Sequence, residues 1–347
     1  MTYYLVIYLF SLFVFAFSFD RHTVSINNSI LVLLFSFFII FICGFRYGIG
    51  TDYWSYYNIY KGGKDYERIE LGFKSLVKFS WLISPDNFSF FIFLVAFLSI
   101  FIKCIYFSQL KNPFFAVVIY VCLYYFPLDF NVIRQGLASS FIYFAVEEGK
   151  KKNLLGYLLF LFAAFLFHYT SIIFLVLYPI CRRKMTFKLR NLFFIFIIFL
   201  ILRMSVIPLV FDFFRNLIVS KTSSPVIMQL VNYFWLSDFH FSLNFWRRLV
   251  FIIAYLLIFG TKNANCYFVF YLFSFIISTV LTGNDIFSYR LSAWFDIFSI
   301  PLFCSRRIPL TRKNAAVIVC FILVLIVLFF ASMKDALPYQ TSWGKIW

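Results

Sequence analysis

Charged residues are scarce in this chain of 347 residues, at 13% of the sequence, while hydrophobic residues make up 63%. Soluble domains are roughly a quarter charged and about half apolar, so this composition excludes a soluble protein and indicates a polytopic membrane protein. The charges that are present are unbalanced, with 31 Lys and Arg against 14 Asp and Glu. In a membrane protein such an excess belongs first to the cytoplasmic loops that set orientation, so nucleic acid is not expected as a partner.

Sequence patterns that hold metals or disulfides are lacking as well. The seven cysteines lie within or at the ends of apolar segments, without Cys-x-x-Cys or Cys/His spacing, which argues against a zinc site and a disulfide framework. An Asp-x-Asp pair is also missing, so we expect neither a metal nor a cofactor. The first apolar run has no basic region before it and no small-residue cleavage site, and we expect it to be a retained helix.

Apolar runs long enough to cross the about 30 Å of a bilayer core recur along the whole chain. They lack the alternation of strands, so the sequence predicts an all-α, polytopic transmembrane helix bundle of about 11 to 12 spans. We expect one integral membrane domain over residues 1–347, with the polar stretches 45–87 and 211–245 as loops on the outer side. The apolar runs cover residues 3–19, 28–44, 88–106, 113–128, 131–148, 188–210, 246–261, 264–282, 288–304 and 315–331.

The segment 154–180 is too long for one comfortable helix and is interrupted around His168. Basic clusters stand at both of its ends, Lys150–Lys152 before it and Arg182–Lys184 after it. Both clusters should be cytoplasmic, which a single crossing cannot achieve. We therefore predict two short helices that turn near His168, although a single span stays open as an alternative. The same charge rule assigns Lys103 to a cytoplasmic loop.

Residues 45–53 place Arg46, Asp52 and a Gly-x-Gly loop directly after an apolar run. The glycines allow backbone and side chains to converge on a ligand. Tyr53 and Tyr56 add flat rings with polar tips, which suit stacking on sugars. The alternative is structural, with Arg46 as an anchor at the membrane edge and Asp52 as the cap of a helix.

A second polar group, formed by Asn131, Arg134 and Gln135, lies on one face at the start of an apolar helix. An arginine one turn inside the membrane is costly unless it meets an anion or a cavity, and a guanidinium suits a phosphate. The alternative is that Arg134 snorkels to the surface. Between the two groups, Glu70 and Lys74 lie on the polar stripe of an amphipathic segment, which predicts an interfacial helix.

Two further candidates lie at polar breaks in apolar sequence. His168 stands at the predicted turn. The alternative to a functional role is that it is a hydrogen-bonded residue of the core. Asp285, Tyr289 and Arg290 precede an apolar helix that carries Asp296. An internal pair between Arg290 and Asp296 is as compatible with this spacing as an anion site.

Together these segments resemble the EpsG/Wzy-like polysaccharide polymerases of bacterial envelopes. The resemblance rests on the order and spacing of short motifs that cover most of residues 40–300, and it implies a GT-C-like helical fold. The motifs are Arg46-x-Gly-x-Gly-Thr-Asp-Tyr-x-x-Tyr56, Glu70-x-Gly-Phe73, Asn131-x-x-Arg134-Gln-Gly-Leu-Ala138, Phe167-His168-x-x-Ser171 and Tyr289-Arg290.

Enzymes of this kind move a growing glycan from an undecaprenyl-diphosphate carrier to the sugar of another lipid-linked repeat unit. The resemblance thus implies an inverting, metal-independent glycosyltransferase, an O-antigen or exopolysaccharide polymerase of lipopolysaccharide biosynthesis. It would be a multi-pass protein of the bacterial inner membrane whose active site faces the periplasm. The implied partners are the undecaprenyl-diphosphate-linked oligosaccharide, membrane lipids and, as an open option, a chain-length regulator. A lipid-linked oligosaccharide flippase or other transporter and an O-antigen ligase are the alternatives.

Several arginines on one face of a membrane suit a diphosphate leaving group, because fixed donors stabilise the charge that builds on it. The acceptor hydroxyl also needs a base, for which Asp52 and His168 compete. A carboxylate among arginines is a poorer base than a neutral histidine, which favours His168 and leaves Asp52 to orient the acceptor or an arginine. We therefore expect His168 and Asp52 to be catalytic, with Arg46, Arg134 and Arg290 at the diphosphate, and Tyr53, Tyr56, Asn131, Gln135, Asp285 and Tyr289 at the sugar or in support.

The turn at His168 predicts a labelling pattern. In a cysteine-free variant that still makes polymer, single cysteines at Lys151, Tyr169 and Arg183 should report their side of the membrane. A membrane-impermeant maleimide added from outside should label position 169 and spare 151 and 183, because the basic clusters stay in the cytoplasm. Labelling of 151 or 183 without 169 would refute the turn.

Overall fold

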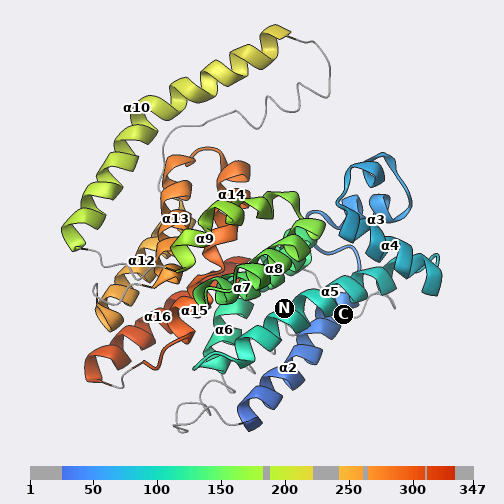
Figure 1. The fold of residues 1–347 in the computed structure, drawn as a ribbon, viewed down its shortest axis with the longest axis horizontal. Coiled ribbons are helices and arrows are strands. Elements are labelled where there is room, and N and C mark those ends of the chain that lie inside the picture. The colour runs from blue at the N-terminus through green and yellow to red at the C-terminus, as the bar shows by residue number, and fades with distance from the viewer. Residues whose placement is uncertain (1–25, 183–187, 222–241, 261–264, 309–310, 333–347) are drawn as a thin grey trace. The chain divides into compact units, whose positions relative to one another are not determined.

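The computed structural model describes residues 26–182, 188–221, 242–260, 265–308 and 311–332. Every regular element in these residues is helical, which confirms the all-α fold (Figure 1). The chain forms two compact units, each described here by itself. Unit 1 comprises residues 1–182, 303–308 and 322–347, and unit 2 comprises residues 183–302 and 309–321.

Unit 1 contains most of the helices, and several are antiparallel neighbours. Figure 1 shows α2 alongside α5 and α7 alongside α8. The elements are α2 (Ile26–Gly44), α3 (Tyr53–Tyr60), η1 (Lys64–Arg68), α4 (Leu71–Ile83), α5 (Phe88–Ser108), α6 (Pro113–Leu123), the π-helical η2 (Tyr125–Asn131), α7 (Ile133–Lys150), α8 (Leu154–Phe167), η3 (Tyr169–Ile172) and α9 (Ile173–Cys181).

Unit 2 is built mainly from α10 (Leu189–Lys221), α12 (Leu243–Phe259), α13 (Cys266–Val280) and α14 (Asp285–Asp296). Two further helices, α15 (Ser299–Cys304) and α16 (Arg312–Ser332), cross from one unit to the other. Helix α10 continues to Lys221, so the predicted loop 211–245 begins later than expected. The apolar sequence that follows Pro208 sustains the helix, and residues 222–241 lie outside the described part.

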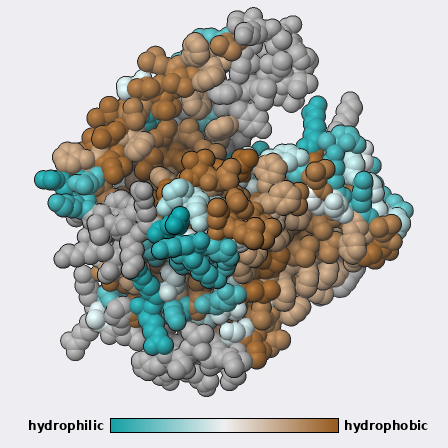
Figure 2. All heavy atoms as spheres, viewed as in Figure 1, coloured by the Kyte–Doolittle hydropathy of each residue, from teal (hydrophilic) through white to brown (hydrophobic). Residues whose placement is uncertain are grey.

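Three helices in the described residues are individually long and apolar enough to cross a membrane: α5, the 190–217 part of α10 and the 314–332 part of α16. The pair α6 and η2 meets the same test as one span bent by 64°. Shorter apolar helices match the predicted runs 28–44 and 264–282 and the segment 154–180, while the predicted run 3–19 lies outside the described residues. Figure 2 shows hydrophobic residues over much of the visible surface. The structure thus confirms a polytopic helical bundle, while the count of eleven to twelve spans stays a prediction.

The segment 154–180 is two helices, as predicted. Helix α8 ends at Phe167, His168 has an extended backbone, and α9 folds back along α8. The hydroxyl of Tyr157 near the start of α8 donates to the carbonyl of Phe174. At the far end of α9, Cys181 lies against Gly149, where a Cβ would come within 2.9 Å of the cysteine Cβ. His168 is therefore at the tip of a helical hairpin.

A buried ion pair fixes the bent span, and it corrects the assignment of Lys103 to a loop. Lys103 is 1% exposed in α5, because that helix continues to Ser108 and turns this residue inward. Its Nζ lies 2.9 and 3.1 Å from the two carboxylate oxygens of Asp129 in η2. Ser99 and Tyr120 also donate to Asp129, at 2.5 and 2.6 Å. The carboxylate therefore receives donors from α5 and α6 and holds both against the π-helical turn.

This pair predicts an asymmetric mutational response. Lys103→Met leaves the Asp129 carboxylate buried without its cation, which should cost about 3–5 kcal/mol of stability. Replacing both residues, as Lys103→Met with Asp129→Leu, should recover much of that loss because no charge remains buried. Thermal unfolding in detergent measures both effects.

The matched control for this experiment is Lys151→Met, which removes an exposed ion pair with Glu148. Exposed pairs contribute about 0–1 kcal/mol, so the control should melt near the wild-type temperature. A Lys103→Met variant as stable as this control would show that the buried pair does not hold the fold.

Candidate functional site

The loop between α2 and α3 is fastened to η2 by Arg46. This side chain is 1% exposed, and its guanidinium donates to the carbonyls of Cys43 (2.7 Å), Ile49 (3.3 Å) and Phe130 (3.2 Å). It also lies 4.7 Å from the centroid of the Phe130 ring. The donors of Arg46 are thus directed at main-chain oxygens of the fold, which favours a positioning role over the expected contact with diphosphate.

Gly50 brings the same loop into contact with Asn131. Its φ is +104°, and a Cβ there would lie 2.5 Å from the carbonyl oxygen of Phe130, so only glycine fits. Beside it, the amide Oδ1 of Asn131 accepts from the backbone N–H of Thr51 at 3.0 Å. The first and third sequence motifs, 80 residues apart, therefore form one structure.

Glu70 is the centre of the polar cluster in unit 1. Its side chain is 4% exposed, and its Oε2 accepts from Nη1 of Arg134 at 2.6 Å. Its other oxygen, Oε1, lies 3.3 Å from Nδ1 of His168. One carboxylate thus links the start of α4, the start of α7 and the tip of the α8–α9 hairpin. We call Glu70, Arg134 and His168 the Glu70 cluster.

Gly72 explains how Glu70 reaches His168. Helix α4 packs so closely on α8 that a Cβ at Gly72 would lie 2.7 Å from the carbonyl oxygen of Leu166. Leu166 is two residues before His168, so this contact sets the distance between the carboxylate and the imidazole. The next residue, Phe73, is fully buried and anchors the helix in the core. In the Glu-x-Gly-Phe motif, Glu70 therefore supplies the carboxylate, Gly72 permits the close contact with α8, and Phe73 packs in the core.

The charge state of Glu70 follows from its two partners. Burial by itself would raise the pKa of the carboxyl, but the hydrogen bond with His168 and the charge of Arg134 outweigh it and lower the pKa below its usual value. Glu70 therefore stays ionised at neutral pH. Its contribution to stability is present above the ordinary glutamate pKa and is lost as the pH falls through the lowered value. An ionised Glu70 holds the other two residues and is a poor base itself.

Tyr56 and Asp52 extend the cluster from α3. Tyr56 is 4% exposed and hydrogen-bonds with Arg134, and burial raises the pKa of its hydroxyl. Asp52 directly precedes α3, is partly exposed and lies within electrostatic reach of Tyr56. Asp52 occupies the N-cap position of α3, as the helix-cap alternative expects, but its carboxylate makes no capping bond to the helix. Asp52 is thus a partly exposed neighbour of Tyr56, which holds Arg134.

Two other predicted residues support these contacts from within unit 1. Gln135 is buried on α7 beside Arg134. Tyr53 is buried on α3, where its hydroxyl bonds to the backbone of Gly48, and burial raises the pKa of that hydroxyl. Both therefore belong to the packing around the polar group.

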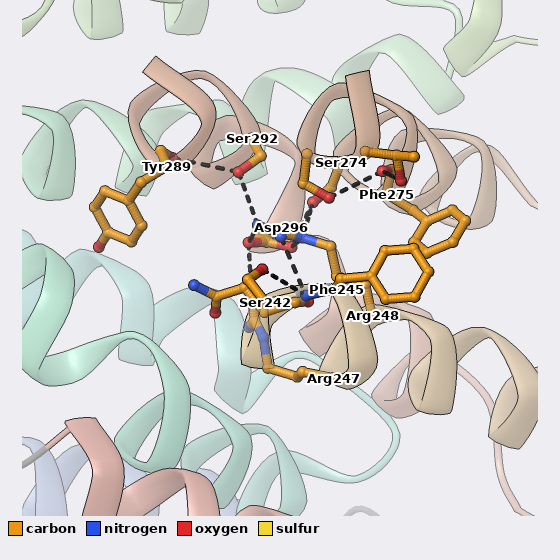
Figure 3. Close-up of polar contacts among 12 residues, drawn as sticks. Ser242, Phe245, Arg247, Arg248, Ser274, Phe275, Tyr289, Ser292 and Asp296 are labelled. Atoms are coloured by element: carbon orange, nitrogen blue, oxygen red, sulfur yellow. Dashed lines mark hydrogen bonds and ion pairs between the residues drawn. The ribbon is translucent and has the colours of Figure 1, made fainter. Parts of the chain in front are cut away.

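The remaining predicted residues belong to unit 2, where a different pair forms around Asp296. Figure 3 shows Arg247 and Arg248 of α12 directed at this carboxylate, with Ser274 and Ser292 beside it. Arg247 Nη2 lies 2.7 Å from one carboxylate oxygen, and Arg248 reaches both oxygens at 2.5 and 2.8 Å. The pair between Arg290 and Asp296 that the sequence left open is thus replaced by pairs with α12, because Asp296 faces α12 and α13.

Arg290 itself is exposed on α14, and Tyr289 is partly buried one residue earlier. Asp285 is the first residue of α14, whose N-terminus is capped by Asn284 through the N–H of Phe287 at 2.9 Å. These residues begin the helix that carries Asp296. The described residues contain no group of three or more His, Cys, Asp or Glu side chains that could hold a metal ion.

Sequence reasoning missed Glu70 as a site residue and did not pair Arg247 and Arg248 with Asp296. Glu70 stands on a stripe with Lys74 and Lys78, which suggested a solvated face, but contacts with Arg134 of α7 and with His168 at the end of α8 accompany its burial. Its place in a motif beside Gly72 was the available signal. The two arginines follow a polar segment, where arginines commonly anchor at the membrane edge.

The family model described as EpsG family matches residues 29–341, nearly the whole chain. The chain belongs to the EpsG family. The motifs that meet around the Glu70 cluster all lie inside the matched residues. Neither the curated proteins nor the solved structures include a match to this chain. Membership makes this a membrane-embedded protein of polysaccharide biosynthesis, in a polymerase-like family associated with glycosyltransferase activity.

Proposed function

We propose that this EpsG-family protein is a polysaccharide repeat-unit polymerase of the bacterial inner membrane. It transfers a growing glycan from undecaprenyl diphosphate to a sugar hydroxyl of a second lipid-linked repeat unit, on the periplasmic side. Family membership supports the class of reaction. The observation that carries the proposal is the Glu70 carboxylate, which holds a candidate base and a candidate phosphate ligand within one cluster.

His168 is the base in this scheme. Nδ1 is directed at Glu70, so we assign proton transfer to Nε2 of the imidazole, whose side chain is 25% exposed at the hairpin tip. A carboxylate behind an imidazole fixes its tautomer and orientation, as in other acid–base sites. Nε2 removes the proton of the acceptor hydroxyl as that oxygen attacks the anomeric carbon. A single displacement of this kind inverts the configuration at that carbon.

Arg134 receives the leaving group. As the bond from the anomeric carbon to the carrier oxygen breaks, its electron pair goes to the diphosphate, and a positioned donor there contributes about 10²–10³ in rate. The Arg134 side chain is 29% exposed, and one of its terminal nitrogens is committed to Glu70. A guanidinium has five N–H donors, so donors beyond those bonded to Glu70 and Tyr56 remain for phosphate oxygens. This cation takes the place of a metal, and the scheme uses no cofactor.

The other predicted residues take supporting roles. Tyr56 and Glu70 hold Arg134, while Arg46 and Asn131 are positioning residues for the loop that ends at Asp52. Asp52, partly exposed at the end of that loop, orients the acceptor sugar. Tyr53 and Gln135 support this group from the core. Arg290 remains a proposed contact for the carrier diphosphate, and Asp285 and Tyr289, at the start of α14, remain proposed contacts for the sugar or supporting residues.

The lipopolysaccharide or capsule ladder of a strain without this gene tests the reaction class. A polymerase defect leaves one repeat unit attached and removes the longer products. Loss of every unit, including the first, would instead indicate a flippase or a ligase and would overturn the proposal.

Arg134 gives the sharpest variant in the same assay. Arg134→Lys keeps the charge but loses the paired donors that contact both Glu70 and a phosphate, so its ladder should fail nearly as completely as that of Arg134→Ala. The variants are compared at equal expression in the membrane. The control is Lys78→Arg, an exchange between lysine and arginine at an exposed position of α4. A normal ladder from Arg134→Lys would remove this residue from the site.

A further inference from the structure

A cavity of about 660 Å³ lies beside α3, on unit 1 and outside the Glu70 cluster. One wall consists of the aromatic side chains Tyr47, Tyr53, Trp54 and Tyr57. The other wall consists of residues 84–89, which form the turn between α4 and α5 and the first two residues of α5. Its volume is within the range of about 300–1,000 Å³ that small-molecule sites occupy.

The aromatic wall is held rigid by contacts among its own rings. Trp54 meets Tyr47, Tyr53 and Tyr57 edge-on, with ring centroids 5.3–6.0 Å apart and interplanar angles of 76–86°. Trp54 and Tyr47 nevertheless stay 50% and 46% exposed. Large rings that are fixed in place and half uncovered offer flat apolar faces at little cost in conformational entropy.

The other wall is polar apart from Pro85 and Phe88. Asp86 is exposed, with 93% of its side chain accessible, and its carboxylate lies 3.0 Å from Nζ of Lys61. Ser84, Asn87 and Ser89 add oxygen and nitrogen atoms along the same wall. Stacking faces and hydrogen-bonding groups in one cavity suit a sugar ring, which has apolar C–H faces and hydroxyls at its edge.

Helix α3 connects this cavity to the Glu70 cluster. Tyr53 and Tyr57, four residues apart, line the cavity, whereas Tyr56 contacts Arg134. A saccharide in the cavity would therefore be one helix away from the proposed reaction centre. That separation suits a sugar that is several bonds from the one that reacts.

We infer that this cavity is a carbohydrate subsite that binds the oligosaccharide repeat unit at a sugar remote from the reacting bond. The inference rests on the proposed function for the identity of the saccharide. Binding energy at a remote sugar orients the reacting end. The subsite thus selects the repeat unit, while the Glu70 cluster acts on the bond between the anomeric carbon and the carrier oxygen.

Saturation-transfer NMR on the purified protein in nanodiscs tests the inference. The probe is the carrier-free repeat-unit oligosaccharide, released by partial acid hydrolysis of the polymer from the producing strain. Trp54→Ala should bind it about tenfold more weakly than wild type, because it removes the central ring. Trp246→Ala is the matched control, since Trp246 is also 50% exposed but belongs to unit 2, and it should bind like wild type.

The outcomes separate this inference from the proposed function. His168→Gln should bind the oligosaccharide normally while its polymerisation rate falls about 10²–10⁴-fold, because it changes only the base. Undiminished binding by Trp54→Ala, or equal losses in Trp54→Ala and Trp246→Ala, would overturn the subsite and assign the rings to the membrane interface. Oligosaccharide binding that depends on Trp54, in a protein whose deletion removes every repeat unit, would support the subsite and overturn the polymerase.

The growing chain and the incoming unit carry the same sugars, so a second arm distinguishes them. A longer oligosaccharide of several repeats should compete with the single unit at equal molar affinity if the cavity holds the incoming unit. An affinity that rises with the number of repeats and depends on Trp54 would assign the cavity to the growing chain, which contradicts a subsite for one repeat unit.

Discussion

The buried carboxylate of Glu70 is the constraint on which the polar part of unit 1 depends. An ionised group that is 4% exposed needs partners, and it finds them in Arg134 and His168. These partners begin α7 and end α8, so the carboxylate can be satisfied only when both helices meet the start of α4. Gly72 permits that meeting, and the hairpin of α8 and α9 presents His168 at its tip. Because the buried charge of Glu70 needs partners, the fold brings the candidate base His168 and the cation Arg134 to the same carboxylate.

The same rule organises the other buried charges. Lys103 with Asp129 fixes the π-helical turn, and Asp296 draws Arg247 and Arg248 into unit 2 (Figure 3). Arg46 is satisfied by carbonyl oxygens instead. In this family member, charged side chains inside apolar helices therefore serve first as cross-links between helices. Arg134 differs in remaining partly exposed while it is held, which suits a residue that receives a ligand.

Much of the fold was predictable because apolar runs and breaks are local properties of the sequence. The helices, the break at His168 and the amphipathic α4 all follow from periodicity and charge. The places of Arg134 and His168 beside one another were only implied by the resemblance. The role of Glu70, the clamp made by Arg46, the burial of Lys103 and the partners of Asp296 were not predictable. Each depends on which face of one helix meets which face of another, and a single sequence does not fix that choice for residues far apart in the chain.

The most direct test of the central claim is a double-mutant cycle between Glu70 and His168, read as the initial polymerisation rate of purified protein on lipid-linked repeat units. Glu70→Gln preserves shape and removes the charge, and His168→Gln removes the base. If Glu70 acts through His168, each single variant should lose about 10²–10⁴ in rate, and the double variant should lose little more than the worse of the two. Losses that multiply in the double variant, at equal folding and membrane level, would show that the two residues act independently and would contradict the account.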